Sequence, residues 1–271
     1  MNIHEIKTHN KHVWRPKIVG LIRERNEALI LQDTLDELAK IADAIVVFDD
    51  ASEDDSVKIA LNHPKVVKIL ANQTWNSDVD RSKDETLQRG ALLQAGMKYH
   101  PKWILYQDAD ERFEKPEKVR EFMLNNAKNP KVSSITFTFY DAYMTKKDQE
   151  PYTGGKLYGF RKMFGVERRE IPMAWKPNKD IRYPEDIPDL RVPVGIDPKK
   201  AVKKFFVQHY GKSLSVDQWE ETCDYYIEHF PGYAEKWKKR KGKGIHSTKS
   251  DFGTKLLTWE EVKKNKDVLI G

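Results

Sequence analysis

Short apolar runs alternate with amphipathic stretches through the first half of the chain. Three helices are predicted, over residues 26–40, 52–61 and 82–99, because their apolar positions recur at helical spacing. The runs before and between these helices have the length and the β-branched or aromatic content of buried strands: residues 17–22, 44–48, 66–70 and 103–106. Strands and helices that alternate in this order are typical of a parallel sheet with helices on both faces.

Polar residues follow these apolar runs directly. Asp49 and Asp50 come after residues 44–48, and three acids follow residues 103–106: Asp108, Asp110 and Glu111. In an open α/β sheet, ligands bind at the carboxyl ends of the strands. Two carboxylates one residue apart can share a hard divalent cation and leave positions for phosphate oxygens. The alternative is a strand followed by a solvated acidic turn.

Composition limits the function classes only broadly. The chain has 271 residues, 33% of them charged, with a net charge of +6. We expect an N-terminal polar segment over residues 1–15, one α/β catalytic domain over 16–212 and a basic, helical C-terminal extension over 213–271. The sequence shows no apolar run of transmembrane length and no signal-peptide core, and its single cysteine, Cys223, fits a reducing compartment. These features predict a cytoplasmic protein.

Glycine-rich phosphate loops are missing from the first half of the sequence. Neither Gly-x-Gly-x-x-Gly nor a Walker-type Gly-Lys-Ser/Thr follows a predicted strand, which argues against dinucleotide-binding and P-loop proteins. A nucleotide can still bind at the strand ends. Asp49 or Asp50 would accept hydrogen bonds from the base or ribose, and a metal at Asp110 would neutralise a diphosphate.

Three ordered segments carry a family resemblance. They are Val-Gly-Leu-Ile-Arg-Glu-Arg-Asn-Glu (19–27), Ile-Val-Val-Phe-Asp-Asp-Ala-Ser-Glu-Asp (45–54) and Ile-Leu-Tyr-Gln-Asp-Ala-Asp-Glu (104–111). Together they resemble the nucleotide-binding half of family 2 glycosyltransferases with the A-type fold, over roughly residues 16–116. The resemblance implies that a sugar moves from a nucleoside-diphosphate sugar to an acceptor. One departure is Ala51, where the family usually has glycine before serine; alanine tolerates most turns.

The resemblance also implies roles for individual residues. Asp49 or Asp50 would line the nucleoside pocket with Glu27 and the neighbouring Arg23, and Arg81 would touch the base. Asp108 would approach the ribose or the metal, and Asp110 would be the principal metal ligand. For two of these residues a purely structural role stays open as an alternative. Glu27 fits an ordinary first-turn helix acid, and Arg81 fits an ion pair with a nearby acid, Asp78, Asp80 or Asp84.

The second half of the sequence is less regular. Residues 132–139 and 157–164 are β-rich, and Gly154 and Gly155 lie between them. In the A-type fold a glycine-containing loop near this position often borders the donor sugar, although a plain hairpin turn fits as well. Residues 171–198 are rich in proline and predict a long loop.

This loop carries the candidates for the catalytic base. An inverting transfer needs a carboxylate near the acceptor hydroxyl to take its proton. The resemblance implies an acid in this part of the chain, and Glu185 and Asp186 fit by order and composition. Asp189 and Asp141 are alternatives, and a surface acidic turn is the simplest reading of the cluster.

A histidine follows the next apolar run. His209 comes directly after residues 205–208 and before Tyr210-Gly211. Such a histidine is commonly structural. The resemblance implies another role, because in many A-type enzymes a histidine on the C-terminal side of the catalytic base completes the metal site. Imidazole suits Mn²⁺ better than Mg²⁺, so we expect Mn²⁺ to be the preferred ion.

Aromatic and basic residues dominate the end of the sequence. A helical, aromatic stretch starts at Ser215, and the basic run Trp237–Lys243 follows it. A solvated tail is the default interpretation of this run. The sharper one is attraction to an anionic membrane or to a phosphate-bearing acceptor.

These patterns predict an α/β protein of the glycosyltransferase A-type fold, with a mostly parallel central sheet and a C-terminal helical extension. Its activity would be metal-dependent, inverting transfer to a saccharide, lipid-linked or protein acceptor, as in polysaccharide biosynthesis. A location at the inner face of the membrane fits the basic run. One alternative is a sugar-phosphate nucleotidyltransferase, which usually carries a glycine- and arginine-rich N-terminal loop. The other is a basic nucleic-acid-binding protein, which has no need for acids at several strand ends, so we expect no nucleic acid partner.

Overall fold

The chain folds into two compact units, and each unit is made of three separate segments of the chain. The computed structural model describes residues 3–8, 15–76, 80–165 and 169–264. Unit 1 comprises Met1–Ala109, Lys115–Phe137 and Ile171–Phe205, and unit 2 comprises Asp110–Glu114, Thr138–Glu170 and Phe206–Gly271. The expected domain boundaries at residues 15/16 and 212/213 stay a prediction.

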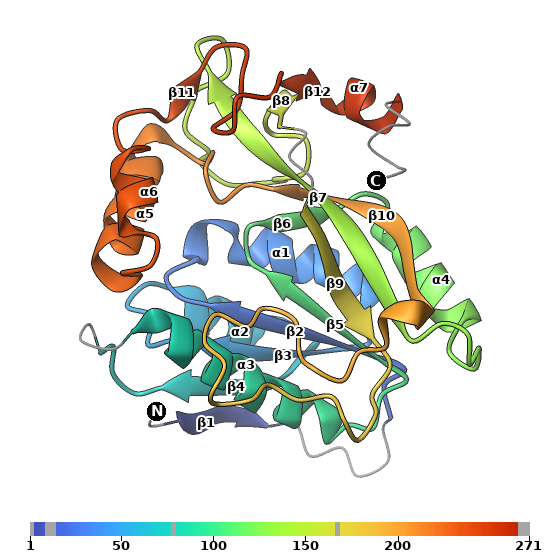
Figure 1. Cartoon of the computed structure of the whole chain (residues 1–271). Coiled ribbons are helices and arrows are strands. Elements are labelled where there is room, and N and C mark those ends of the chain that lie inside the picture. Colours follow the sequence, from blue (N-terminus) through green and yellow to red (C-terminus); the bar gives the residue numbers. More distant parts are fainter. Residues whose placement is uncertain (1–2, 9–14, 77–79, 166–168, 265–271) are drawn as a thin grey trace. The chain divides into compact units, whose positions relative to one another are not determined.

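Unit 1 is built on a mostly parallel sheet. Its strand order is β1-β4-β3-β2-β5-β9; β2, β3, β4 and β5 are parallel, and β1 and β9 pair antiparallel with β4 and β5. The strands are β1 (Ile3–Thr8), β2 (Ile18–Glu24), β3 (Ala44–Asp49), β4 (Val66–Asn72), β5 (Trp103–Asp108) and β9 (Arg169–Trp175), and β9 begins in unit 2. The helices are α1 (Ala28–Ile41), α2 (Ser56–Asn62), α3 (Arg81–Met97) and α4 (Pro116–Asn125). The α/β class expected from the sequence is confirmed (Figure 1).

Two glycines show that helices cover both faces of this sheet. A Cβ on Gly20 of β2 would lie 2.9 Å from Leu38 of α1, and a Cβ on Gly96 of α3 would lie 2.7 Å from Leu21 of β2. Because successive side chains of a strand point to opposite faces, α1 and α3 pack on opposite faces of β2. Each glycine permits a close approach between helix and sheet.

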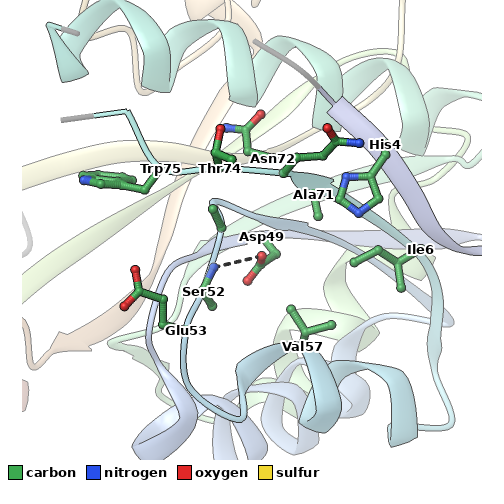
Figure 2. A pocket seen from close by; sticks show the side chains of 12 residues that line it. His4, Ile6, Asp49, Ser52, Glu53, Val57, Ala71, Asn72, Thr74 and Trp75 are labelled. Carbon is green, nitrogen blue, oxygen red and sulfur yellow. Dashed lines mark hydrogen bonds between the residues drawn. The ribbon is translucent and has the colours of Figure 1, made fainter. Parts of the chain in front are cut away.

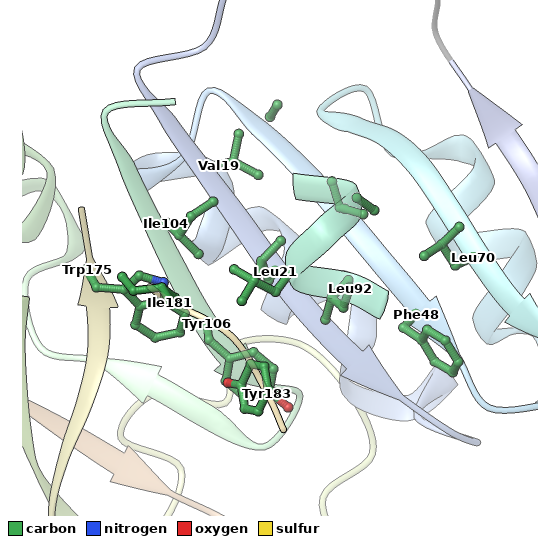
Figure 3. Close-up of a cluster of buried hydrophobic side chains, with 14 of the residues drawn as sticks. Val19, Leu21, Phe48, Leu70, Leu92, Ile104, Tyr106, Trp175, Ile181 and Tyr183 are labelled. Carbon is green, nitrogen blue, oxygen red and sulfur yellow. The ribbon is translucent and has the colours of Figure 1, made fainter. Parts of the chain in front are cut away.

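The core of unit 1 fills the space between α3 and the sheet (Figure 3). Leu92 of α3 lies among residues of three neighbouring strands, Leu21, Phe48 and Ile104. Trp175, Ile181 and Tyr183 close one end of this cluster. The continuous apolar runs of the sequence are therefore explained by strands that are buried on both faces.

Unit 2 is a smaller assembly of short strands and helices. β6 (Glu111–Phe113) pairs antiparallel with β10, and β7 pairs with β8 (Met163–Phe164) and β11 (Ile245–His246). β12 (Leu257–Thr258) pairs with β8. β7 (Ser134–Thr145) and β10 (Ala201–His209) have residues in both units. The helices are α5 (Val216–His229), α6 (Ala234–Lys238) and α7 (Trp259–Lys264).

Aromatic side chains hold α5 and α6 together. Trp237 of α6 is buried beside Trp219 and stacks on Tyr226 of α5, with 4.4 Å between ring centroids and 5° between planes. Cys223 is buried in the same cluster. The helical, aromatic stretch expected from Ser215 is present, and Trp237 serves this packing.

Three segments differ from the sequence-based expectations. Residues 171–175, expected in a loop, belong to β9, whose residues Ala174 and Trp175 pair with β5. Residues 157–164 form strand only at Met163–Phe164, because the chain turns at Gly159 with φ 79°. The polar N-terminal segment contains β1. Within the described residues, no helix is long and apolar enough to cross a membrane.

Candidate active site

The acids at the end of β3 are buried and hydrogen-bonded within unit 1. Asp50 is 1% exposed; it accepts a hydrogen bond from Asn72 Nδ2 at 2.6 Å and pairs with Arg81. Arg81, which opens α3, also pairs with Asp84 at 2.9 Å. Arg81 therefore contacts both a strand-end acid and a neighbouring helix acid; the pair with Asp84 was one of those considered from the sequence, and the pair with Asp50 was not. Asp78 lies outside the described residues.

Asp49 lies beside a second buried acid. Its Oδ2 accepts a hydrogen bond from the Ser52 backbone N–H at 3.1 Å, and its carboxylate is hydrogen-bonded to Glu24 of β2. Burial, together with repulsion from Asp49, raises the pKa of Glu24 well above its ordinary value. This raised pKa favours the protonated form of Glu24, which the sequence gave no reason to expect.

A pocket of about 530 Å³ opens over these strand ends (Figure 2). Asp49, Ser52, Asn72 and Trp75 line it. The guanidinium carbons of Arg25 and Arg81 lie 3.8 and 4.0 Å from the centroid of the Trp75 ring. The pocket thus offers carboxylate and amide groups on its floor and an aromatic ring fixed by two cations at its side.

The loop below this pocket holds a residue in a left-handed conformation. Ala51 has φ 56°, a region that favours glycine. Arg25 Nη1 donates to the carbonyl oxygen of Asp50 at 2.8 Å and also to that of Ala51, which fixes this conformation. The turn is therefore one that glycine fits better than alanine.

Arg23 and Glu27, both expected near the nucleotide, are engaged in unit 1 contacts. Arg23 donates to Glu85 at 2.8 Å and to Gln88 at 3.3 Å, both on α3. Glu27 caps α1, since its carbonyl oxygen accepts from the Ile30 and Leu31 N–H groups. The half-buried Glu27 thus lies at the N-cap of α1, one position before the first turn in which its simpler interpretation placed it.

Asp108, at the end of β5, is held by a phenol and a guanidinium. Tyr106 Oη donates to it at 2.7 Å, and Arg191 Nη2 lies 3.3 Å from its Oδ2. Burial works to raise the pKa of Asp108, but Arg191, Arg89 and Arg23 hold it at about 2. Asp108 is therefore a carboxylate over the whole physiological pH range.

Unit 2 brings together three potential metal ligands. Asp110, Glu111 and His209 offer ligand atoms that all lie within 4.8 Å of one another. His209 Nε2 is 3.3 Å from Asp110 Oδ2, and the β6–β10 pairing sets Glu111 opposite His209. A Cβ on Gly211 would lie 2.4 Å from Asp110 Oδ2, so glycine leaves room for the carboxylate.

Asp141 orients His209 from its other side. His209 Nδ1 lies 2.8 Å from Asp141 Oδ1, and Lys212 Nζ donates to Asp141 Oδ2 at 2.7 Å. Burial opposes ionisation of Asp141, but Lys212, Arg169 and His209 hold its pKa well below the usual range. Burial favours a neutral His209 ring, yet the carboxylates of Asp110 and Asp141 raise its pKa to about 9 despite the opposing charge of Arg169.

The remaining predicted residues lie in exposed turns. Glu185 and Asp186 are exposed in unit 1, and the loop that carries them is tied to α3 by hydrogen bonds from the Asp189 N–H to the Ser82 carbonyl and from the Leu190 N–H to Thr86 Oγ1. Gly154 and Gly155, in unit 2, have φ values of 114° and 94°. A Cβ on either glycine would meet nothing within 4 Å, so backbone conformation explains these glycines.

Several residues of these sites had no clear signal in the sequence. Trp75, Arg191 and Lys212 lie outside the motifs, and each has a partner that is distant in the chain. An aromatic or basic residue in an irregular segment is too common for its position to be informative. Glu24 and Glu111 lie within the motifs, and Glu111 was named among the acids after residues 103–106, but neither was given a role.

Comparisons of this sequence with known proteins identify the family to which the chain belongs. The model of glycosyl transferase family 2 matches residues 24–185, more than half of the chain. Two uncharacterised proteins, from Mycobacterium bovis and Mycobacterium tuberculosis, are each 31% identical over 94 residues, which cover 35% of this chain and 23% of the relative. The chain thus spans about a quarter of the length of these curated relatives.

Solved structures give more distant similarities. One is glucosyl-3-phosphoglycerate synthase from Mycobacterium tuberculosis, in complex with Mn²⁺, uridine diphosphate and glucosyl-3-phosphoglycerate, with 13% identity and a TM-score of 0.32 over 46% of this chain and 44% of that chain. Another is TarS from S. aureus, with 13% identity and a TM-score of 0.40 over 78% of this chain and 39% of that chain. The family model, which includes the ends of β2, β3 and β5, decides the assignment: the chain belongs to glycosyltransferase family 2.

Proposed function

We propose that the protein transfers a sugar from a nucleoside-diphosphate sugar to a saccharide, lipid-linked or protein acceptor, with a divalent cation and with inversion at the anomeric carbon. The observation that carries the proposal is the meeting of Asp110, Glu111 and His209 in unit 2 of a family 2 glycosyltransferase. Family membership also argues against the two alternatives, a nucleotidyltransferase and a nucleic-acid-binding protein.

The donor set suits a divalent cation of the Mn²⁺ type. Carboxylates suit Mg²⁺ and Mn²⁺, and the imidazole of His209 favours Mn²⁺. Asp110 and His209 would hold the ion, with Glu111 as the third ligand, and Asp141 would keep Nε2 of His209 turned toward it. When bound, such an ion withdraws charge from the leaving diphosphate.

The pocket of unit 1 is the proposed nucleoside site. Asp49 has a buried oxygen available to a ribose or base donor beside its bond to Ser52. The Trp75 ring lines one side of this pocket and holds the guanidinium groups of Arg25 and Arg81 over it, so it would bound the space for the base. Asp50 and Arg81, which pair with each other, would support this site by holding its shape.

Glu185 and Asp186 remain the proposed sources of the catalytic base. Both are exposed, so an acceptor hydroxyl can reach them, and one would take the hydroxyl proton as the new glycosidic bond forms. Asp141 is less suited to this role. Its carboxylate is already paired with cations and its pKa is depressed, so it holds a proton poorly.

Donor turnover in the presence and absence of metal tests the proposal. The full chain is incubated with a panel of nucleoside-diphosphate sugars and Mn²⁺, and release of the nucleoside diphosphate is measured. We expect turnover with one donor class, its loss in excess chelator, and its loss in Asp110→Asn but not in the exposed control Asp217→Asn. Full activity of Asp110→Asn, or turnover unchanged by chelator, would contradict the metal site.

A membrane location stays a separate proposal. Trp237 is buried, so only the lysines of Trp237–Lys243 are left to meet anionic lipid. Each basic residue near such a surface contributes about 1 kcal/mol. Sedimentation with anionic liposomes at low and high salt checks this, and no binding at low ionic strength would leave a solvated segment.

A further inference from the structure

Three cations of unit 2 surround one exposed aromatic ring. The Nζ atoms of Lys212 and Lys236 lie 5.5 and 5.8 Å from the centroid of Phe252, and the guanidinium carbon of Arg240 lies 5.3 Å from it. We call Lys212, Lys236, Arg240 and Phe252 the cation cluster. All of them lie beyond the segment that the family model matches, so the family alone does not explain them.

Phe252 is held in its exposed position by an ordered turn. The Ser250 hydroxyl accepts from the Phe252 N–H at 3.2 Å and from the Thr254 N–H at 3.3 Å, and the Gly253 N–H donates to the Ser250 carbonyl at 3.0 Å. The Phe252 side chain is nevertheless 56% exposed. The Nζ of Lys236 also lies 5.9 Å from the ring centroid of Tyr233, which is 40% exposed.

Charge in the cluster is only partly balanced. Asp251 pairs with Lys212 and Arg240 at 3.2 Å each, and Asp141 pairs with Lys212 at 2.7 Å. Lys236 has no carboxylate within ion-pair distance among the described residues. Burial, with repulsion from Arg240 and Lys212, lowers the pKa of Lys236. An anion bound between these groups would relieve that repulsion.

The form of the cluster favours a small phosphorylated ligand. A phosphate accepts charge-assisted hydrogen bonds from several cations at once. An aromatic ring held out of the core offers a flat apolar surface to the C–H face of a sugar. From this combination we infer that the cation cluster binds the acceptor through a phosphate group, with the acceptor's sugar ring against Phe252. The inference rests on the proposed transferase function and narrows its acceptor to a sugar phosphate.

Lys212 ties the cluster to the candidate metal site. Its Nζ bonds Asp141, and Asp141 in turn bonds His209. A phosphate at the cluster would therefore use none of the proposed metal ligands, since Asp141 links Lys212 to His209. This separation assigns the cluster to the acceptor, because the donor diphosphate belongs at the metal.

Binding measured without donor or metal tests the inference. Calorimetry is performed on the full chain with glucose 6-phosphate, inorganic phosphate and unphosphorylated glucose. We expect Lys236→Gln to weaken both phosphate probes about tenfold, the loss of one charge-assisted hydrogen bond. The control Lys238→Gln removes the same charge from an exposed position of α6 and should bind like the parent. Phe252→Ala should weaken glucose 6-phosphate and leave inorganic phosphate unchanged.

Three results would overturn the inference. Equal phosphate affinity in the parent and Lys236→Gln would remove the cluster as the site. An equal loss of nucleoside diphosphate–Mn²⁺ affinity in Lys236→Gln would assign it to the donor. Binding to phosphatidylglycerol vesicles that depends on Lys236, without sugar-phosphate binding, would assign it to a membrane. Because these measurements use no donor, an inactive protein that binds glucose 6-phosphate contradicts the proposed function, and an active one that does not bind it contradicts this inference alone.

Discussion

Glu24 and Asp49 stand opposite each other in the β2–β3 pairing, and their carboxyl groups share a hydrogen bond. Glu24 Oε1 and Asp49 Oδ1 are buried without another hydrogen-bond partner in the described part of the chain, so a proton on Glu24 would give the Asp49 carboxylate a donor. A carboxylate oxygen that accepts this hydrogen bond can still accept a second one from a ligand. Two adjacent carboxylates cannot both ionise at low cost. Folding therefore favours the form of Glu24 that keeps its proton.

This pair predicts a pH dependence of stability. Burial and then Asp49 raise the pKa of Glu24, so its contribution is fully present below the ordinary glutamate pKa and is lost as pH rises toward the raised value. Glu24→Gln keeps a donor for Asp49 and cannot ionise. We expect its thermal midpoint to exceed the parent's increasingly as pH rises through this window. Glu53→Gln, an 80% exposed side chain, is the control and should follow the parent. A parent curve parallel to that of Glu24→Gln would reject the shared proton.

A second prediction concerns the turn after β3. Ala51 has φ 56°, which costs a non-glycine residue roughly 1–2 kcal/mol. Ala51→Gly should stabilise the protein by about 0.5–1 kcal/mol once the entropy of glycine in the unfolded chain is subtracted. Ala60→Gly, the same change inside α2, should destabilise it by about 1 kcal/mol or more. Denaturant unfolding measures the stability of both variants. A loss of stability in Ala51→Gly would show that the left-handed conformation of Ala51 is not strained.

Nucleoside binding gives a third prediction. Asp49→Ala should weaken nucleoside-diphosphate affinity by about 1–3 kcal/mol through a lost hydrogen-bond partner. Trp75→Ala should also weaken it, because the ring that holds Arg25 and Arg81 beside the pocket is lost. Asp50→Ala differs, because it also leaves Arg81 and Asn72 without their partner. Calorimetry together with a thermal midpoint separates the two effects. Unchanged affinity in both Asp49→Ala and Trp75→Ala would place the nucleoside elsewhere.

Asp141 supports a fourth prediction, on both metal and stability. Its removal leaves Lys212 buried without one of its two carboxylates, and breaking such a buried pair typically costs about 3–5 kcal/mol. It also removes the carboxylate that faces Nδ1 of His209, which among the described residues keeps only Arg169 Nη2 at 3.1 Å, and losing an orienting partner commonly lowers metal affinity about 10- to 100-fold. Asp141→Asn should show both losses in unfolding and Mn²⁺ titrations. Parental Mn²⁺ affinity in a folded Asp141→Asn would show that it does not position His209.

The catalytic base is the fifth prediction. Glu185→Gln or Asp186→Asn, whichever removes the true base, should lower kcat by about 10²–10⁴-fold with donor binding nearly unchanged. Asp189→Asn tests the third acid of the same loop. Parental rates in both Glu185→Gln and Asp186→Asn would place the base outside this pair.

Much of unit 1 was predictable because its physical basis is local. Strands buried on both faces leave continuous apolar runs in the sequence, as at Ile45–Phe48 of β3. β9 was missed because Pro172 and a short run of mixed residues hide a strand whose pairing with β5 is antiparallel and brief. β1 was missed because His4, Glu5 and Lys7 make an edge strand look like a polar tail.

The candidate site residues show the same difference between local patterns and long-range contacts. Asp49, Asp50 and Asp110 could be named because each follows a strand directly, and chain order alone places them at strand ends. Arg191, which holds Asp108, and Lys212, which holds Asp141, could not, because only the folded chain brings them to partners more than fifty residues away. The proton on Glu24 depends on burial, which no local pattern reveals.

The segment structure of unit 2 has a kinetic consequence. β6 pairs with β10 although about a hundred residues separate Glu111 from His209. During synthesis, Asp110 and Glu111 leave the ribosome long before their partner strand, and pairings of this range form slowly. The short β6 must wait with its edge uncovered, so the yield of folded protein during expression should be limited by the arrival of the last segment of unit 2 and not by the formation of the parallel sheet.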